Sequence, residues 1–95
     1  MKGRTPQEFL DGLSLCQELV FVYRGRTMCV QGWAEEDERI MFKLEQWQPW
    51  LDDEHLLWMH RASTAAECVD AFVAVPLFDG RTFWEAENEI EVVFA

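Results

Sequence analysis

Through the first half of the chain, hydrophobic residues recur at alternate positions, a spacing typical of β-strands. The pattern covers residues 19–23, 27–33 and 39–47. Arg24-Gly25-Arg26 supplies a hairpin turn between the first two segments, and residues 34–38 supply an acidic turn between the next two. Pro49 ends the third segment, because proline lacks the N–H that a central strand needs. The sequence therefore predicts an antiparallel meander of three strands.

A helix-start signature occurs three times outside this region. In a capping box, a threonine hydroxyl accepts the amide of the third helical residue, and a glutamate there reaches back to the threonine amide. The pairs are Thr5 with Glu8, Thr64 with Glu67, and Thr82 with Glu85. We expect helices over about 6–14, 65–74 and 83–88. Their expected inward-facing residues are Phe9, Leu10 and Leu13; Ala65, Cys68, Val69, Phe72 and Val73; and Phe83, Trp84 and Ile90.

Residues 56–61 admit two interpretations. Their side chains alternate as in a fourth strand, whereas the preceding Asp52-Asp53-Glu54 could begin a helix. We favour the strand, because the helix over 65–74 has its own start signal soon afterwards. The predicted fold class is α+β, with one helix, an antiparallel sheet of three to four strands, and two further helices, packed mainly on one face. Residues 1–95 form a single domain in this prediction.

Composition narrows the class of protein. Hydrophobic residues make up 49% of the 95 residues, including five Trp and seven Phe, which favours a packed core over disorder. The 18 acidic and 8 basic residues give a net charge of -10, which repels phosphate backbones and attracts basic surfaces. We therefore expect no direct nucleic-acid binding. No apolar run is long enough for a membrane span, so we expect no membrane partner and a cytoplasmic location.

Candidate chemistry is sparse in this sequence. Cys16, Cys29 and Cys68 are an odd number without a CxxC pair, which favours buried, reduced thiols over a disulfide framework. His55 and His60 are the only histidines, and their spacing of five places them on different faces of a helix or a strand. No hydrolase, zinc-protease or nucleotide-loop motif is present. We therefore expect no enzyme, no catalytic residue, no cofactor and no bound metal.

Two acidic runs and two tryptophans are the candidate partner-binding residues: Glu35, Glu36, Asp37 and Glu38; Asp52, Asp53 and Glu54; and Trp47 and Trp50. The second run fits an acidic loop or a helix start better than a cation site, because it lacks the ligand spacing of a calcium loop. Carboxylates on turns can imitate the phosphates of DNA, which carries one charge per ~1.7 Å of axis. A tryptophan beside a proline-bounded loop is typical of an interface anchor. Ordinary solubility and core packing are the alternative interpretations of these residues.

Two segments carry a resemblance to known proteins. They are Phe78-Asp79-Gly80-Arg81-Thr82-Phe83-Trp84-Glu85 followed by Ile90-Glu91, and the first hairpin, Val20-Phe21-Val22-Tyr23-Arg24-Gly25-Arg26. With them the sequence resembles a family of short, acidic, uncharacterised proteins from bacteria, phages and mobile elements. The resemblance covers most of the chain and implies a helix, a β-meander, a helix, an Asp-Gly turn and a short helix, with no catalytic residues to carry over. Some small acidic proteins of this kind are anti-CRISPR inhibitors.

These observations lead to one expected function and one alternative. We expect a non-enzymatic acidic inhibitor or regulator that binds the basic, nucleic-acid-binding surface of a partner protein. Its most concrete form is an anti-CRISPR protein that binds a CRISPR effector complex by DNA mimicry. The alternative is a structural or assembly module that self-associates through its open sheet face or an edge strand. The sequence leaves monomer and homodimer both open.

Overall fold

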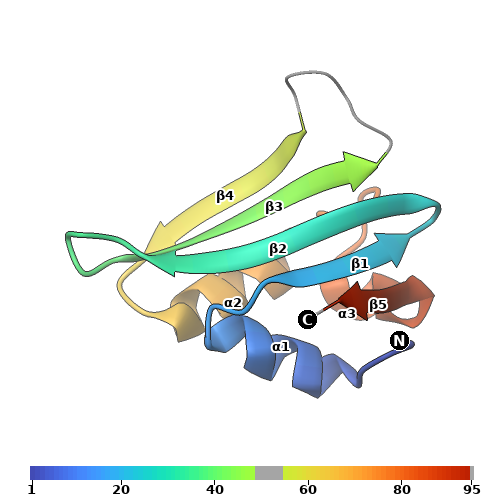
Figure 1. Ribbon diagram of the computed structural model, residues 1–95, viewed down its shortest axis with the longest axis horizontal. Helices are drawn as coiled ribbons and strands as arrows, with labels where there is room; N and C mark the ends of the chain where they lie inside the picture. The colour runs from blue at the N-terminus through green and yellow to red at the C-terminus, as the bar shows by residue number, and fades with distance from the viewer. Residues whose placement is uncertain (49–54, 95) are drawn as a thin grey trace.

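The computed structural model describes residues 1–48 and 55–94 and places a five-stranded antiparallel sheet over a layer of helices (Figure 1). The strands are β1 (Leu19–Tyr23), β2 (Arg26–Ala34), β3 (Ile40–Gln48), β4 (Leu56–Ala62) and β5 (Ile90–Phe94). The helices are α1 (Pro6–Ser14), α2 (Ala65–Ala74) and the short α3 (Phe83–Ala86), which a 3-10 turn, η1 (Glu87–Glu89), follows. The strand order β4-β3-β2-β1-β5 makes β4 and β5 the edges of the sheet.

A two-residue turn joins β1 to β2. Arg24 and Gly25 have φ angles of 49° and 78°, and Tyr23 pairs with Arg26 across the turn. Positive φ at both turn positions matches the twist of the flanking strands, and glycine adopts it without a Cβ clash. The predicted hairpin is therefore confirmed, and its register aligns the alternating core residues of the two strands.

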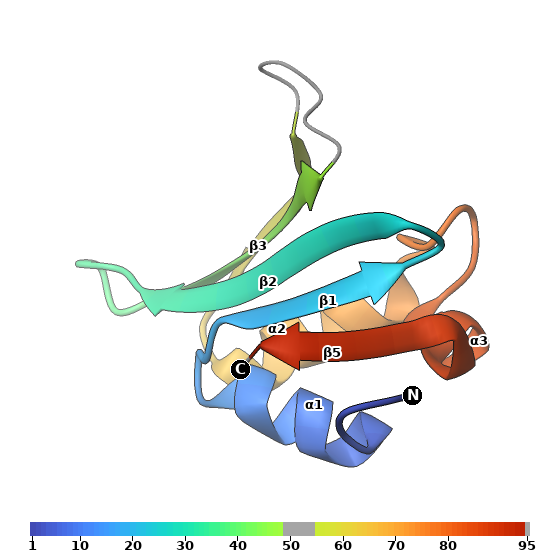
Figure 2. The same ribbon diagram turned by 45° about the vertical axis from the view of Figure 1, so that its right-hand side comes forward.

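The helices cover one face of the sheet (Figure 2). An aromatic cluster fills the space between the two layers. Phe72 of α2 is fully buried at its centre. Its ring centroid lies 6.2 Å from that of Phe9 in α1 and 5.9 Å from that of Trp58 in β4. The rings of Phe78 and Phe83 lie 6.1 Å and 5.7 Å away. Phe72 thus joins elements from both ends of the chain into one core.

Side-chain caps start the two longer helices, but they differ in detail. At α1 the complete capping box forms, since the Glu8 N–H donates to Thr5 Oγ1 (3.1 Å) and the Thr5 N–H donates to Glu8 Oε1 (3.0 Å). At α2 the Glu67 N–H donates to Thr64 Oγ1 (3.2 Å). The Glu67 carboxylate, however, accepts from the Ser63 N–H (3.2 Å) and not from Thr64. The second predicted box is therefore only half right.

The C-terminal segment corrects the sequence prediction most. A fifth strand, β5, pairs antiparallel with β1 and sets Ile90 opposite Tyr23, so the sheet has five strands and not three to four. The third helix ends at Ala86, earlier than predicted. Trp84 does not dock this helix, because its side chain is 53% exposed, whereas Phe83 is fully buried. The strand favoured over residues 56–61 is confirmed as β4.

Candidate partner-binding surfaces

The acidic turn between β2 and β3 projects from one end of the sheet, beyond the helices (Figures 1 and 2). The Glu35 N–H donates to the Arg39 carbonyl (2.7 Å), and the Glu38 N–H donates to the Glu35 carbonyl (3.0 Å), which closes the turn. Glu38 has a φ of 68°. This left-handed conformation is unfavourable for a residue with a Cβ and would suit glycine or asparagine better. The backbone conformation of the turn therefore does not explain why a glutamate occupies this position.

Two of the four carboxylates in this turn are neutralised by arginines. Glu35 Oε1 lies 2.8 Å from Nε of Arg61 in β4. Asp37 pairs at 3.2 Å with the arginine that ends the turn. Glu36 and Glu38 are exposed and make no ion pair within the part of the chain that the structure describes. The turn therefore presents two uncompensated negative charges to solvent.

A further carboxylate lies at the same end of the sheet. Ile40 at the start of β3 pairs with Ala62 at the end of β4, and α2 begins shortly afterwards. Glu67 in the first turn of α2 is exposed. This end of the sheet therefore carries the Glu67 carboxylate as well as the acidic turn.

The second predicted acidic run and one predicted anchor lie outside the described residues: Asp52, Asp53, Glu54 and Trp50. The described chain leaves β3 at Gln48 and resumes at His55, at the opposite end of β3 from the acidic turn. A strand of this length spans about 30 Å. The two predicted acidic runs therefore connect to opposite ends of β3.

The outer face of the sheet, which the helices leave uncovered, carries an exposed tryptophan. Trp33 near the end of β2 is 38% exposed, and Lys43 Nζ lies 5.6 Å from the centre of its ring. Trp47, a predicted anchor, follows the buried Gln46 along β3 and is itself half-buried. It sits in a β-bulge, since the pairing with β2 skips it. Bulges re-aim side chains, so Trp47 is turned relative to a regular strand position.

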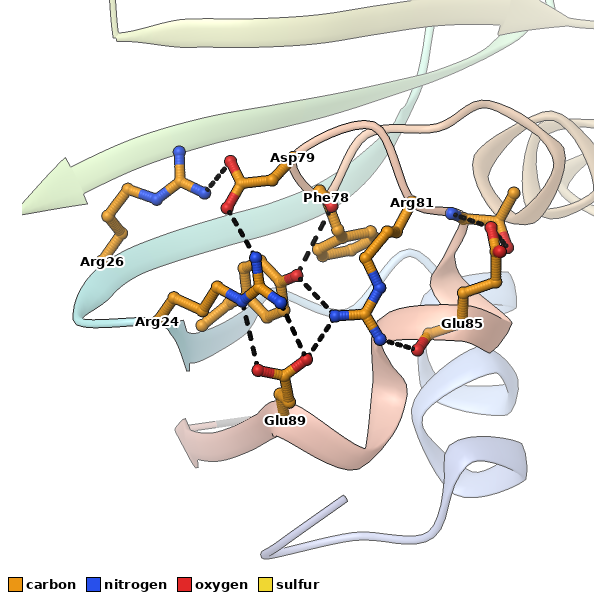
Figure 3. Close-up of polar contacts among 9 residues, drawn as sticks. Arg24, Arg26, Phe78, Asp79, Arg81, Glu85 and Glu89 are labelled. Carbon is orange, nitrogen blue, oxygen red and sulfur yellow. Dashed lines mark hydrogen bonds and ion pairs between the residues drawn. The ribbon is translucent and has the colours of Figure 1, made fainter.

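A cluster of arginines at the other end of β2 fastens the β1–β2 hairpin to the C-terminal segment (Figure 3). Arg24 Nε donates to Glu89 Oε1 (3.1 Å), and Arg81 donates to the same carboxylate. Arg26 donates to Asp79 Oδ1 (2.6 Å). Hydrogen bonds from Arg24 and then Arg81 lower the pKa of Glu89. Each guanidinium already has a carboxylate partner. The cluster therefore holds the hairpin against the C-terminal segment and is not an anion-binding site.

The sequence pattern did not point to this cluster. Most residues of the cluster come from two turns, Arg24-Gly25-Arg26 and Asp79-Gly80-Arg81. Both turns belong to the segments that carry the resemblance described above. The fold brings these turns together although more than fifty residues separate them. Only the strand pairing of β1 with β5 reveals that they share one end of the sheet.

The three cysteines are free thiols. Cys29 and Cys68 are buried as predicted, whereas Cys16 is half-buried. Burial raises the pKa of Cys29 to about 12, and the nearby Glu18 and Glu45 add to this effect. Burial also raises the pKa of the other two thiols. All three therefore stay protonated at neutral pH, a state in which a thiol is a poor nucleophile.

The two histidines have separate surroundings. His55 Nε2 lies 3.5 Å from Glu45 Oε2, and the ring of His60 stacks on Trp58 with centroids 5.8 Å apart. Among residues 1–48 and 55–94, no group of three or more His, Cys, Asp or Glu side chains is placed to hold a metal ion, and no pocket is found. The same residues include no helix that is long and apolar enough to cross a membrane.

Comparisons with protein-family models, with curated proteins and with solved structures found no match to this chain. The surfaces described above are therefore the basis for a functional proposal.

Proposed function

We propose that this protein is a non-enzymatic inhibitor or regulator that binds a basic surface of a partner protein through the acidic turn between β2 and β3. A surface that normally holds nucleic acid is the kind of partner that fits. An anti-CRISPR protein that acts by DNA mimicry is the most concrete form of this function. The observation that carries the proposal is the pair of exposed carboxylates, Glu36 and Glu38, on a turn that projects from the sheet.

Electrostatics favours such a partner. A net charge of -10 attracts a basic surface over long range and speeds the encounter. The carboxylates of the acidic turn that lack an arginine partner are the charges that such a surface can neutralise. In addition, Glu38 has a left-handed backbone conformation, which is unfavourable for glutamate. Backbone strain of this kind is often retained where a side chain has a function.

Trp33 supports the same contact. It is 38% exposed and precedes Glu35 by two residues, so it lies beside the acidic turn. Aromatic side chains next to charged groups are enriched at protein interfaces and often supply much of the binding energy. Trp47 lies near the opposite end of β3. We therefore assign the anchor at this end of the sheet to Trp33.

A charge-reversal experiment tests the proposal. In the variant Glu36→Lys/Glu38→Lys, each substitution changes the charge by +2, which moves the net charge from -10 to -6. The variant Asp70→Lys/Glu91→Lys has the same net charge, and its two sites are exposed and lie on α2 and β5. Both variants should fold, because exposed substitutions usually cost less than about 0.5 kcal/mol. The pair therefore separates the position of the charge from its amount.

The assay measures how each protein competes with labelled target DNA for a purified, guide-loaded CRISPR effector complex. Wild type and the Asp70→Lys/Glu91→Lys control should displace the DNA at similar concentrations. The Glu36→Lys/Glu38→Lys variant should need roughly tenfold more protein or beyond, since two charge contacts are reversed. Equal loss in both variants would assign the effect to net charge and not to the turn. If wild type displaces no DNA, this form of the proposal is wrong.

A further inference from the structure

The two edges of the sheet are protected differently. At β5, the Lys2 N–H donates to the Ile90 carbonyl and the Val92 N–H donates to the Lys2 carbonyl, each at 2.9 Å. The N-terminal amine of Met1 lies 3.2 Å from a carboxylate oxygen of Glu87 and holds this segment against the edge. At β4, no segment within the described residues pairs with the outer edge (Figure 1). Such an edge offers its free N–H and C=O groups to another chain.

The composition of β4 makes this edge unusual for so acidic a protein. Leu57 and Met59 are 38% and 41% exposed. No Asp or Glu occurs in residues 55–66. Arg61 is already paired with Glu35 at 2.8 Å, so its charge is largely neutralised. Sheets commonly protect an edge with lysine, proline or a β-bulge. β4 contains neither lysine nor proline, and its bulge lies near its start, at Leu57, which the pairing with β3 skips. The strand residues of a second copy therefore bring no carboxylate of their own to this edge, where the Glu35 carboxylate is paired with Arg61.

Two copies of β4 can pair antiparallel about its central residue, Met59. This pairing sets Trp58 opposite His60 and brings Leu57, which lies in a β-bulge, near Arg61. The residue numbers of each facing pair differ by an even number. The helix-covered faces of the two sheets therefore lie on the same side of the joined sheet. The two Arg61 side chains are four strand positions apart, about 13 Å, which exceeds the Debye length of about 8 Å at physiological salt. The two Arg61 side chains therefore repel each other only weakly.

We infer that β4 pairs with β4 of a second copy of this chain across a two-fold axis, which joins two five-stranded sheets into one continuous sheet. The contact is isologous, so it closes on itself and yields a dimer. It lies outside the acidic turn and does not depend on the proposed function. A contact through one strand is small, so the dimer is weak and depends on concentration. Since each copy carries -10, salt strengthens the dimer, whereas salt weakens binding of the acidic turn to a basic partner.

Sedimentation equilibrium measures this association directly. From micromolar to millimolar protein, the average mass should rise from 11.2 kDa toward twice that value, and it should rise earlier at higher salt. In the same range of concentration, hydrogen exchange of the backbone amides in β4 should slow down, while that in β5 should not change. A mass that stays at 11.2 kDa at millimolar protein and high salt overturns the inference.

Substitutions at the centre of the strand test the register. Met59→Lys places two ammonium groups opposite each other and should weaken the dimer roughly tenfold or more. Val93→Lys is the matched control, since Val93 is 53% exposed on β5 at the other edge of the sheet. An equal mixture of Met59→Lys and Met59→Glu should restore association as a heterodimer. Equal weakening by Met59→Lys and Val93→Lys, or no restoration in the mixture, would show that the contact lies elsewhere.

Discussion

Phe72 is the residue whose removal should cost the fold most. Its side chain is fully buried and contacts the rings of Phe9, Trp58, Phe78 and Phe83. Deleting a buried phenylalanine ring costs about 3–5 kcal/mol, from lost burial and from the cavity that remains. Rings that are fixed on four separate segments cannot all close such a cavity. We therefore expect Phe72→Ala to cost about 4 kcal/mol of unfolding free energy.

This loss is large for a domain of this size. At about 0.05–0.15 kcal/mol per residue, the total unfolding free energy is about 5–14 kcal/mol. The unfolding entropy is about 0.2 kcal/mol/K, so the loss should lower Tm by about 20 °C. Urea and thermal melts followed by circular dichroism measure both quantities. Trp84→Ala is the control, because it removes a large ring that is 53% exposed and should cost about 1 kcal/mol or less. Similar losses in the two variants would refute the packing described for α2 and β4.

Three further outcomes follow from the structure. Thr5→Ala should cost about 1 kcal/mol, and the double variant with Glu8→Ala should cost less than the sum of the single variants in urea melts, because the two residues share one capping box. Hydrogen bonds from Arg24 and Arg81 hold the pKa of Glu89 below its usual 4.5, so its stabilising effect is present above that pH and is lost as the pH falls through the lowered pKa. Glu89→Gln should therefore be less stable than wild type at neutral pH, and the difference should shrink in melts at lower pH. Gel shifts at sub-micromolar protein and physiological salt should show no binding to duplex or single-stranded DNA.

The parts of the fold that the sequence predicts well have a local signal. The period of two over the meander, the Arg24-Gly25 turn and the Thr5–Glu8 box each depend on residues within a few positions of one another. The strand β5 has no such signal. Its five residues follow an acidic helical turn, and its partner, β1, lies about 70 positions earlier in the chain. Whether such a short run forms a strand depends on its pairing with another strand and not on its own pattern of hydrophobic residues.

The candidate surfaces depend even more on long-range geometry. The sequence places four acidic residues in one turn, but only the register of β3 and β4 shows that Arg61 neutralises Glu35. Likewise, Phe83 and Trp84 are adjacent in sequence and similar in chemistry, and the docking of one helical turn decides which of them is buried. The uncovered edge at β4 follows from the strand order, which no local pattern specifies.

The salt dependence of direct binding tests the role of the acidic turn most directly. The affinity of wild type, of Glu36→Lys/Glu38→Lys and of Asp70→Lys/Glu91→Lys for a guide-loaded CRISPR effector complex is measured from low to physiological salt. Wild type and the control should bind tightly at low salt and weaken steeply as salt rises. The Glu36→Lys/Glu38→Lys variant should bind much more weakly and show a shallower slope, because charges in the contact are missing. Coincident curves for all three proteins would show that the acidic turn is only a solvated surface.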